Sequence, residues 1–252
     1  MSSIESEERV QEVLQLFQKH VKNFLIEAQP SNAEFNGFIR WADQIGHDRE
    51  ISTFINAFVS PVLIDHQITG DAQTPSTFLD VHYVEGAPIL AKPYKLPMRV
   101  KEIGEKFKFS GYVRDLNGNP LKRALIDMWH VDADGHYSSH ESAAPPYNLR
   151  GRFYTDENGF FEVETIVPSP YTISENGPLA ELLHAVGQNT TIPAHLNIIL
   201  KRKGYETLIT QVFFERKNRL YEGIPSSLIT QISDKNGIKE ASFNFVMKDI
   251  KI

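Results

Sequence analysis

The chain has 252 residues, no cysteine and a formal net charge of −6. Without cysteine it has no disulfide, no thiolate metal ligand and no cysteine nucleophile, and the acidic balance shows no basic footprint for nucleic acid. No apolar run reaches the length of about 18 residues that predicts a membrane span. The N-terminus lacks the basic and apolar regions of a secretory signal, so we expect a cytoplasmic protein. Hydrophobic residues make up 41% of the chain, which is enough for a packed core.

Residues 1–66 are predicted to form a helical region. Apolar residues recur at spacings of three and four from Val10 to Leu25, the pattern of one amphipathic helix. Ser31 followed by Glu34 is a capping-box pattern for a second helix, and a third apolar stripe runs from Ile51 to Val62. These apolar faces must be buried, either in a dimer interface or against a β-domain.

The pattern changes after the helical region. Residues 67–106 have no sustained period and contain several prolines, which is typical of an extended linker that wraps a neighbouring domain. From residue 107 to 252, short strands and turn signals predict a mainly β fold, an antiparallel β-sandwich. We expect strands at residues 108–114, 124–131, 152–155, 160–166, 196–201, 207–214 and 242–248, the first two pairs forming hairpins, and one helix that Gly177-Pro178 opens and Gly187 ends.

One predicted strand carries a pair of polar side chains, His195 and Asn197, two residues apart. At this spacing both side chains point to one face, where a pair of histidines could bind a metal. Here the second member is an amide. An isolated histidine on a strand is more often hydrogen-bonded than a ligand, so the pair alone leaves both readings open.

Two tyrosines, Tyr137 and Tyr171, follow predicted strands and lie in turn-rich sequence, where functional groups are often placed. A tyrosine in such a position is more often half-buried, with its hydroxyl hydrogen-bonded to a neighbour. Taken one at a time, neither tyrosine marks a site.

A series of motifs gives these residues a context. In chain order they are Gly111-Tyr112-Val113-Arg114-Asp115, Trp129-His130, Asp134-Gly135-His136-Tyr137-Ser138, Leu149-Arg150-Gly151-Arg152, Val167-Pro168, Asn176-Gly177-Pro178, Pro193-Ala194-His195 and Leu208-Ile209-Thr210-Gln211. This order resembles the intradiol catechol dioxygenases, and the likeness covers roughly residues 35 to 215. The stretch from Trp129 to Tyr137 is more similar to the hydroxyquinol and catechol 1,2-dioxygenases than to the protocatechuate enzymes.

The resemblance implies a ferric ion held by two tyrosinates and two histidines. Carried over by motif, the ligand positions are Tyr137, Tyr171, His195 and, where the family has its second histidine, Asn197. Phenolates are hard anionic ligands that suit ferric iron. Tyr171 would be the tyrosine that leaves the metal and takes a proton when substrate binds, and Gln211 matches a family glutamine near the iron. The implied reaction opens a catechol- or hydroxyquinol-type diol with O2 to a muconate-type dicarboxylic acid.

Two departures from the family pattern lie close together. Asn197 offers an amide oxygen, a weaker ligand than imidazole, so we expect the iron to be held weakly. Ile192 stands where the family has an arginine thought to stabilise charge on the substrate ring. Loss of one well-placed donor of this kind typically costs about 10²–10³ in rate.

A third departure lies in the linker. The family usually has Gly-Pro and an apolar residue where this chain reads Phe78-Leu79-Asp80-Val81-His82-Tyr83. The positions of Phe78, Val81 and His82 line the substrate pocket in relatives. His82 either approaches the substrate or the metal, or lies at the surface as an ordinary linker residue.

Two classes of function therefore stay open. The paired tyrosines favour an intradiol dioxygenase with altered ligands. The joint loss of a histidine and an arginine favours an inactive or repurposed homologue, such as a binding protein or an enzyme with a different oxygenation chemistry. The resemblance also implies a homodimer formed through the N-terminal helices, with bound phospholipid in several members, and a small aromatic diol and O2 as the partners.

Overall fold

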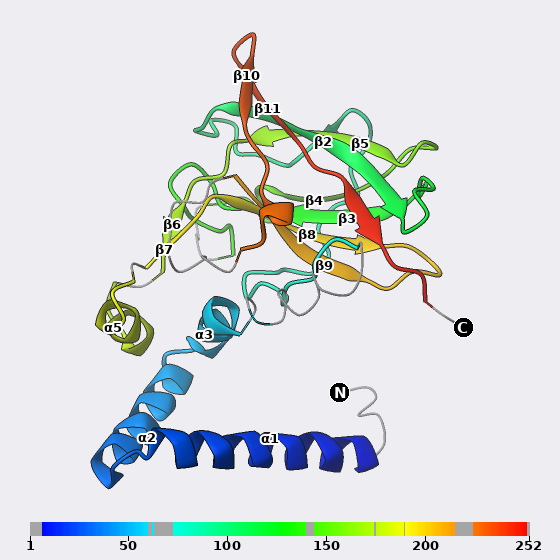
Figure 1. The fold of residues 1–252 in the computed structure, drawn as a ribbon. Coiled ribbons are helices and arrows are strands. Elements are labelled where there is room, and N and C mark those ends of the chain that lie inside the picture. Colours follow the sequence, from blue (N-terminus) through cyan, green and yellow to red (C-terminus); the bar gives the residue numbers. More distant parts are fainter. Residues whose placement is uncertain are drawn as a thin grey trace. The chain divides into compact units, whose positions relative to one another are not determined.

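The computed structural model describes residues 7–59, 62, 73–139, 144–173, 175–188, 190–214 and 224–250. The chain divides into two compact units, Met1–Asp48 and Arg49–Ile252 (Figure 1). No helix among the described residues is both long and apolar enough to cross a membrane.

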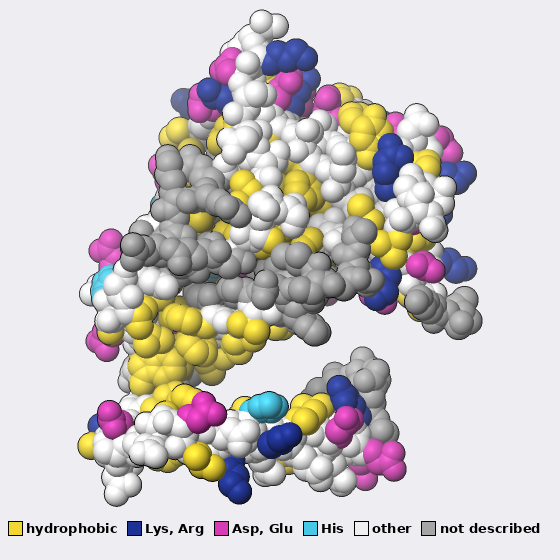
Figure 2. Space-filling model, viewed as in Figure 1, with side chains coloured by type: hydrophobic (Ala, Val, Ile, Leu, Met, Phe, Trp, Pro, Cys, Tyr) yellow, Lys and Arg dark blue, Asp and Glu magenta, His cyan; other side chains and the backbone are white. Residues whose placement is uncertain are grey.

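The first unit consists of α1 (Glu7–Ala28) and α2 (Asn32–His47), as the apolar spacing predicts. The predicted capping box is present: the Ser31 hydroxyl accepts the backbone N–H of Glu34 at 3.3 Å, and the Glu34 carboxylate accepts the N–H of Ser31 at 2.8 Å. No residue of α1 is buried, and Figure 2 shows hydrophobic side chains at its surface. An apolar stripe without burial leaves this helix face for another partner.

The second unit is mainly β. Its larger sheet has the strand order β1 (Tyr94–Lys95), β5 (Phe160–Ile166), β2 (Lys106–Asp115), β11 (Ile238–Ser242) and β10 (Ser233–Lys235), with β12 (Phe245–Met247) also paired to β2. The smaller sheet has the order β4 (Arg150–Tyr154), β3 (Leu125–Trp129), β8 (His195–Lys201) and β9 (Leu208–Phe213). A two-stranded ribbon joins β6 (Tyr171–Thr172) to β7 (Thr191–Ile192).

The two sheets pack through a shared apolar core. The inward side chains of β2, among them Phe107 and Phe109, belong to the same buried cluster as Ile126 and Met128 of β3. All pairs within the smaller sheet are antiparallel, whereas in the larger sheet β1 joins β5, and β11 and β12 join β2, in parallel. The β-sandwich expected from the sequence is therefore confirmed (Figure 1).

The two predicted hairpins are wrong. Strands β2 and β3 follow each other in the chain but belong to different sheets, and so do β4 and β5. Strand β3 instead lies between β4 and β8. A turn signal shows that the chain reverses direction. The same signal occurs whether the next strand pairs in the same sheet or crosses to the other sheet. Nearly every residue of β3 is buried, which suits a central strand with partners on both sides.

Among its described residues the second unit also contains the α-helices α3 (Ile51–Phe58) and α5 (Pro178–Ala185). The latter is the predicted helix that Gly177 opens. Its buried first turn is capped by Glu50, whose carboxylate accepts the backbone N–H of Leu179 at 3.0 Å. A carboxylate at this position satisfies a free N–H group and complements the helix dipole.

The predicted linker forms a strap, residues 73–97, along the sandwich. Backbone N–H groups of Thr74, Thr77, Leu90 and Leu96 donate to carbonyls of β12, β9, β4 and β5, at 3.1, 2.7, 2.7 and 2.9 Å. The hydroxyl of Thr210 adds a bond to the carbonyl of Pro75 at 2.8 Å. The strap is thus attached to both sheets.

Candidate metal centre

The site lies on the face of the smaller sheet that points away from the sandwich core. Trp129, Asn197 and Gln211 are direct partners on the neighbouring strands β3, β8 and β9. Directly paired residues point to the same face of a sheet. His195, two residues before Asn197 on β8, shares that face, as the spacing predicts. A small second apolar cluster around Trp129 and Tyr137 covers this area.

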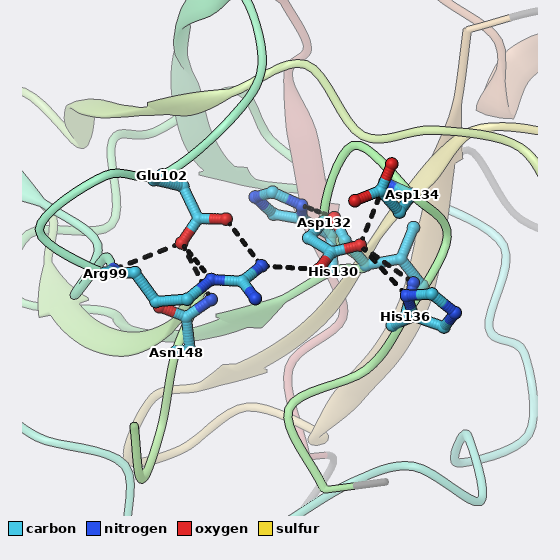
Figure 3. Close-up of polar contacts among 8 residues, drawn as sticks. Arg99, Glu102, His130, Asp132, Asp134, His136 and Asn148 are labelled. Atoms are coloured by element: carbon cyan, nitrogen blue, oxygen red, sulfur yellow. Dashed lines mark hydrogen bonds and ion pairs between the residues drawn. The ribbon is translucent and has the colours of Figure 1, made fainter. Parts of the chain in front are cut away.

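Tyr137 is presented to this face by a tight turn that Asp132 holds together (Figure 3). One carboxylate oxygen of Asp132 accepts the backbone N–H groups of Asp134 at 3.0 Å and His136 at 2.9 Å. The other oxygen accepts the guanidinium of Arg99 at 2.5 Å. The turn is therefore stabilised by hydrogen bonds within it and by the ion pair between Asp132 and Arg99.

Glu102 extends this support. Its carboxylate pairs with Arg99 at 2.9 Å and accepts the side-chain amide of Asn148 at 3.0 Å (Figure 3). Burial acts to raise the pKa of Glu102, but the hydrogen bonds from Arg99 and Asn148 outweigh it and lower the pKa below its usual value. The charged network is thus favourable in the folded chain.

Tyr171 reaches the site from β6, whose pairing places it opposite Ile192 of β7. The turn before Tyr137 packs directly against it. Gly135 has a φ of +84°, and a Cβ placed there would lie 2.9 Å from the Cβ of Tyr171. Glycine is needed here for both the left-handed backbone and the close approach.

The hydroxyl of Tyr137 is the centre of a polar cluster. Asn197 donates its side-chain N–H to this oxygen at 3.0 Å, and the Nε2 atom of His195 lies 3.5 Å away. Tyr171 forms a side-chain hydrogen bond with it, and the two rings meet edge to face at 5.6 Å. Tyr137, Tyr171, His195 and Asn197, predicted from sequence motifs up to 60 residues apart, thus meet at one point.

His195 is held in the form that suits a metal ligand. Its Nδ1 lies 2.8 Å from the carbonyl oxygen of Pro193. A carbonyl can only accept, so Nδ1 carries the hydrogen and Nε2 presents its lone pair to the cluster. Burial lowers the pKa of His195 and keeps the ring neutral.

Gln211 and Asn197 form a chain behind the phenol. Gln211 donates Nε2–H to the side-chain oxygen of Asn197 at 2.9 Å. Asn197 in turn donates its side-chain N–H to the hydroxyl of Tyr137. The amide of Asn197 is therefore oriented by a hydrogen bond at each of its two ends.

One residue next to the cluster, Asp80, was not among the site residues predicted from the sequence. Asp80 of the strap is 8% exposed, and the indole N–H of Trp129 donates to its Oδ2 at 3.0 Å. Its negative charge also raises the pKa of Tyr137. The available signal was a carboxylate in a strap segment that departs from the family pattern, but spacing alone does not show which strap residue turns inward.

The charge around Tyr137 is unusual for a phenol expected to ionise. Burial, followed by the negative charge of Asp80, raises the pKa of Tyr137 well above 10. The guanidinium of Arg150 lies over the ring, 5.6 Å from its centre. Ionisation of Tyr137 in this place requires a strong positive charge nearby, such as a metal ion.

Of the other predicted pocket residues, two lie at the site and two are exposed. His82 stacks on the Tyr137 ring, with centres 4.1 Å apart, so it lies at the site. Ile192 is buried beside Tyr171. Phe78 and Val81 are 38% and 45% exposed and are not enclosed in the cluster.

The donor set fits a hard trivalent cation. Among the described residues no three His, Asp or Glu side chains are grouped to hold a metal, so a metal here depends on the tyrosines. Two phenols and one imidazole with a free lone pair converge on the face of the sheet. Phenolate oxygen and imidazole nitrogen are suitable ligands for ferric iron.

Comparisons with known proteins show the family of the chain. The family model "Dioxygenase" matches residues 80–249. Chlorocatechol 1,2-dioxygenase of Rhodococcus opacus is 32% identical over 251 residues, covering 95% of this chain and 98% of the relative. The 6-chlorohydroxyquinol 1,2-dioxygenase of Cupriavidus pinatubonensis is 29% identical, with coverage of 95% and 90%.

Solved structures show the same fold. The chlorocatechol 1,2-dioxygenase of Pseudomonas putida superimposes with a TM-score of 0.86 at 27% identity, covering 96% of this chain and all of that one. The 3-chlorocatechol 1,2-dioxygenase of Rhodococcus opacus 1CP gives 0.82 at 31% identity, with coverage of 97% and 100%. With the matched domain, the relatives along nearly the whole length and the tyrosine–histidine cluster in place, this chain belongs to the intradiol ring-cleavage dioxygenases, a family of oxidoreductases.

Proposed function

We propose that the chain cleaves a catechol-, chlorocatechol- or hydroxyquinol-type diol between its two hydroxyl-bearing carbons, with O2, to a muconate-type dicarboxylic acid. The ligands of the ferric ion are Tyr137, Tyr171 and His195, with Asn197 at the fourth family position. The observation that carries the proposal is their convergence, with the Tyr137 hydroxyl hydrogen-bonded to Tyr171 and Asn197 and 3.5 Å from Nε2 of His195.

A ferric ion bound there supplies Lewis acidity, which lowers the pKa of the diol so that it binds as a catecholate and becomes reactive toward O2. The chain's own residues then position and exchange protons. Tyr171 is the less buried of the two tyrosines, and we assign to it the proton released by the diol. Tyr137 is 3% exposed and held by Asn197, so it stays in place.

The surrounding residues set the pocket and the rate. His82, stacked on Tyr137, provides one wall, and Phe78 and Val81 lie along the same strap. Gln211 orients Asn197. Ile192 supplies no charge where the family has an arginine, so we propose slower turnover than in relatives that keep it, on the scale of 10²–10³ that one lost electrostatic donor typically costs.

The helical region, residues 1–66, is proposed to form a homodimer, with phospholipid as a further occupant of the interface. The support is α1, which has an apolar stripe and no buried residue. A cytoplasmic location stays a prediction.

Visible colour and O2 uptake test the function together. Ferric tyrosinate absorbs visible light, so protein reconstituted with ferric iron should be coloured and should consume O2 with catechol, 4-chlorocatechol or hydroxyquinol. The product should show the ultraviolet absorbance of a muconate. Tyr137→Phe is the matched control, because it removes one ligand oxygen and little volume. Colourless protein that consumes no O2 with any of the three diols would contradict the proposal and favour an inactive homologue.

A further inference from the structure

Asp80 is a carboxylate built into the donor cluster. Its Oδ2 accepts the indole N–H of Trp129 at 3.0 Å, and its Oδ1 accepts the backbone N–H of His82 at 3.2 Å. The negative charge of Asp80 raises the pKa of Tyr137, and the neighbouring His82 ring stacks on the Tyr137 ring with centres 4.1 Å apart. With 8% of its surface exposed, Asp80 is held by these two hydrogen bonds on the sheet face where the phenol lies.

Among the described residues no ion pair within 4 Å includes Asp80, although its charge acts on the nearby guanidinium of Arg150. The nearby cation, Arg150, instead bonds to the hydroxyl of Ser138 at 2.8 Å, and one of its terminal nitrogens has no hydrogen-bond partner in the described structure. A buried carboxylate is costly unless it is paired or coordinates a metal. Three negative ligands, Asp80 and two tyrosinates, would balance the charge of a ferric ion.

Asn197, at the position of the family's second histidine, is already committed elsewhere. Its oxygen, the atom of an amide that can bind a metal, accepts the N–H of Gln211 at 2.9 Å. Its NH2 group, which has no lone pair to offer, is the part that faces Tyr137. The arrangement makes Asn197 a hydrogen-bond donor that positions the phenol oxygen.

The backbone on both sides of Asp80 is anchored. Before it, the N–H of Thr77 donates to the carbonyl of Ile209 on β9 at 2.7 Å. After it, the hydroxyl of Tyr83 donates to the carboxylate of Asp127 on β3 at 3.1 Å. The carboxylate is therefore delivered to the sheet face by a segment attached to two of its strands.

We propose that Asp80 is the fourth protein ligand of the ferric ion, so that the site consists of two tyrosines, one histidine and one aspartate. The inference rests on the proposed function. It replaces the expectation of weakly held iron with a complete set of four ligands, in which a carboxylate from the strap substitutes for an imidazole from β8. The oxygen of a carboxylate is hard and anionic, which suits the trivalent ion.

Ferric binding to variants of the full chain tests this assignment. We expect Asp80→Asn to lower ferric affinity, measured by competition with a chelator, by more than the roughly 10–100-fold that loss of a supporting residue costs. The charge-transfer band should move to longer wavelength, because iron with one anionic ligand fewer is a stronger electron acceptor. Asp115→Asn is the matched control: the Asp115 carboxylate likewise accepts the backbone N–H two residues on, from Asn117 at 2.9 Å, but it lies at the end of β2, so affinity and band should not change.

A double-variant cycle separates a ligand from a supporting residue. If Asp80 fills the missing position, Asn197→His raises ferric affinity strongly in the Asp80→Ala background and little in the wild-type chain. An equal gain in both backgrounds would overturn the proposal, as would an unchanged band in Asp80→Asn. The pair Asp80→Ala with Asn197→His also covers the case in which Asp80→Asn alone fails to fold. Failure of the wild-type chain to bind ferric iron at all would instead overturn the proposed function, and this inference with it.

Discussion

The phenol oxygen of Tyr137 brings together groups that lie far apart in the sequence. It contacts Asn197 and His195 of β8, Tyr171 of β6 and Asp80 of the strap. Since burial and Asp80 both raise its pKa, the protein alone favours the neutral phenol. The cluster is therefore arranged so that a bound cation, rather than the protein, drives ionisation.

Replacement of Tyr137 by phenylalanine should remove the centre of the cluster. In Tyr137→Phe we expect ferric affinity to fall by more than about 100-fold, above the range for a supporting residue, together with most of the visible absorption. The measurement is iron content after dialysis against a chelator. Tyr147→Phe is a suitable control, because the Tyr147 hydroxyl donates to the carbonyl of Glu85 outside the site at 3.1 Å. Equal iron retention in both variants would refute the central role of Tyr137.

His130, next to the site, makes the fold sensitive to acid. Burial lowers its pKa from 6.5 to about 4, while its two ring nitrogens bond to Val131 and Thr165. The unfolded chain binds the proton near pH 6.5, so this contribution to stability is complete above that pH and is lost as the pH falls toward 4. The shift corresponds to about 3 kcal/mol.

We therefore expect the stability difference between wild type and His130→Gln to shrink by about 3 kcal/mol between pH 7.5 and pH 4. Denaturant unfolding of the iron-free chains at several pH values measures it, and the subtraction cancels the other titrating groups. A difference that does not change with pH would show that His130 is protonated in the folded chain as easily as in the unfolded one.

The residues of the site divide by how well the sequence predicts them. Tyr137, Tyr171 and His195 could be found because each lies in a local motif. Asp80 could not, because its role depends on how the strap turns over β3 and β9, and no local pattern determines that turn. The amide orientation of Asn197 likewise depends on Gln211, its partner on the next strand.

At the scale of elements, the turn between β3 and Tyr137 decides where the phenol lies. Gly135 has a left-handed backbone and touches Tyr171. Gly118 offers a matched comparison, since its φ of +82° is nearly the same but nothing lies within 4 Å of its added Cβ. Both glycines have a left-handed backbone, but only Gly135 also lies in close contact with Tyr171.

Gly135→Ala and Gly118→Ala should each lose about 1–2 kcal/mol from the left-handed conformation. Only Gly135→Ala should also displace Tyr171, with a weaker visible band and faster loss of iron to a chelator. Thermal unfolding and the ferric spectrum report the two effects separately. An unaltered spectrum in Gly135→Ala would mean that the contact with Tyr171 does not position the ligand.

The pairing of strands shows where local signals stop. Helix boundaries and most strands follow from apolar spacing and capping residues, as the capping box at Ser31 illustrates. The sheet assignment does not, because β3 takes partners from later in the chain. The Asn236-Gly237 turn, with φ values of 55° and 79°, does form a true hairpin between β10 and β11. Strand β10, which is exposed throughout, lacks the apolar alternation that marks a strand in sequence.

At the scale of the whole molecule, the exposed face of α1 predicts self-association. Phe17 and Phe24 lie on the apolar stripe of α1 and are 65% and 64% exposed, and no residue of this helix is buried. Apolar side chains grouped at a surface commonly mark an interface.

The double substitution Phe17→Glu with Phe24→Glu should therefore shift the chain from dimer to monomer, as measured by light scattering after size exclusion. Gln15→Glu with Asn23→Glu adds the same charge at exposed polar positions of the helix and should leave the dimer intact. A wild-type chain that is monomeric at micromolar concentration would contradict the proposed dimer.

If Asp80 binds the iron, the strap and the iron should be released together. Three of the proposed ligands belong to the sandwich and its loops, and the proposed fourth, Asp80, belongs to a segment that is hydrogen-bonded to four strands. A metal ion bound to the strap and to the sandwich would hold the two together, so that the strap could not detach without releasing the iron. The bonds of residues 74–96 would then exchange their hydrogens slowly in loaded protein and quickly in metal-free protein, and the lifetime of the iron would equal the lifetime of the closed strap.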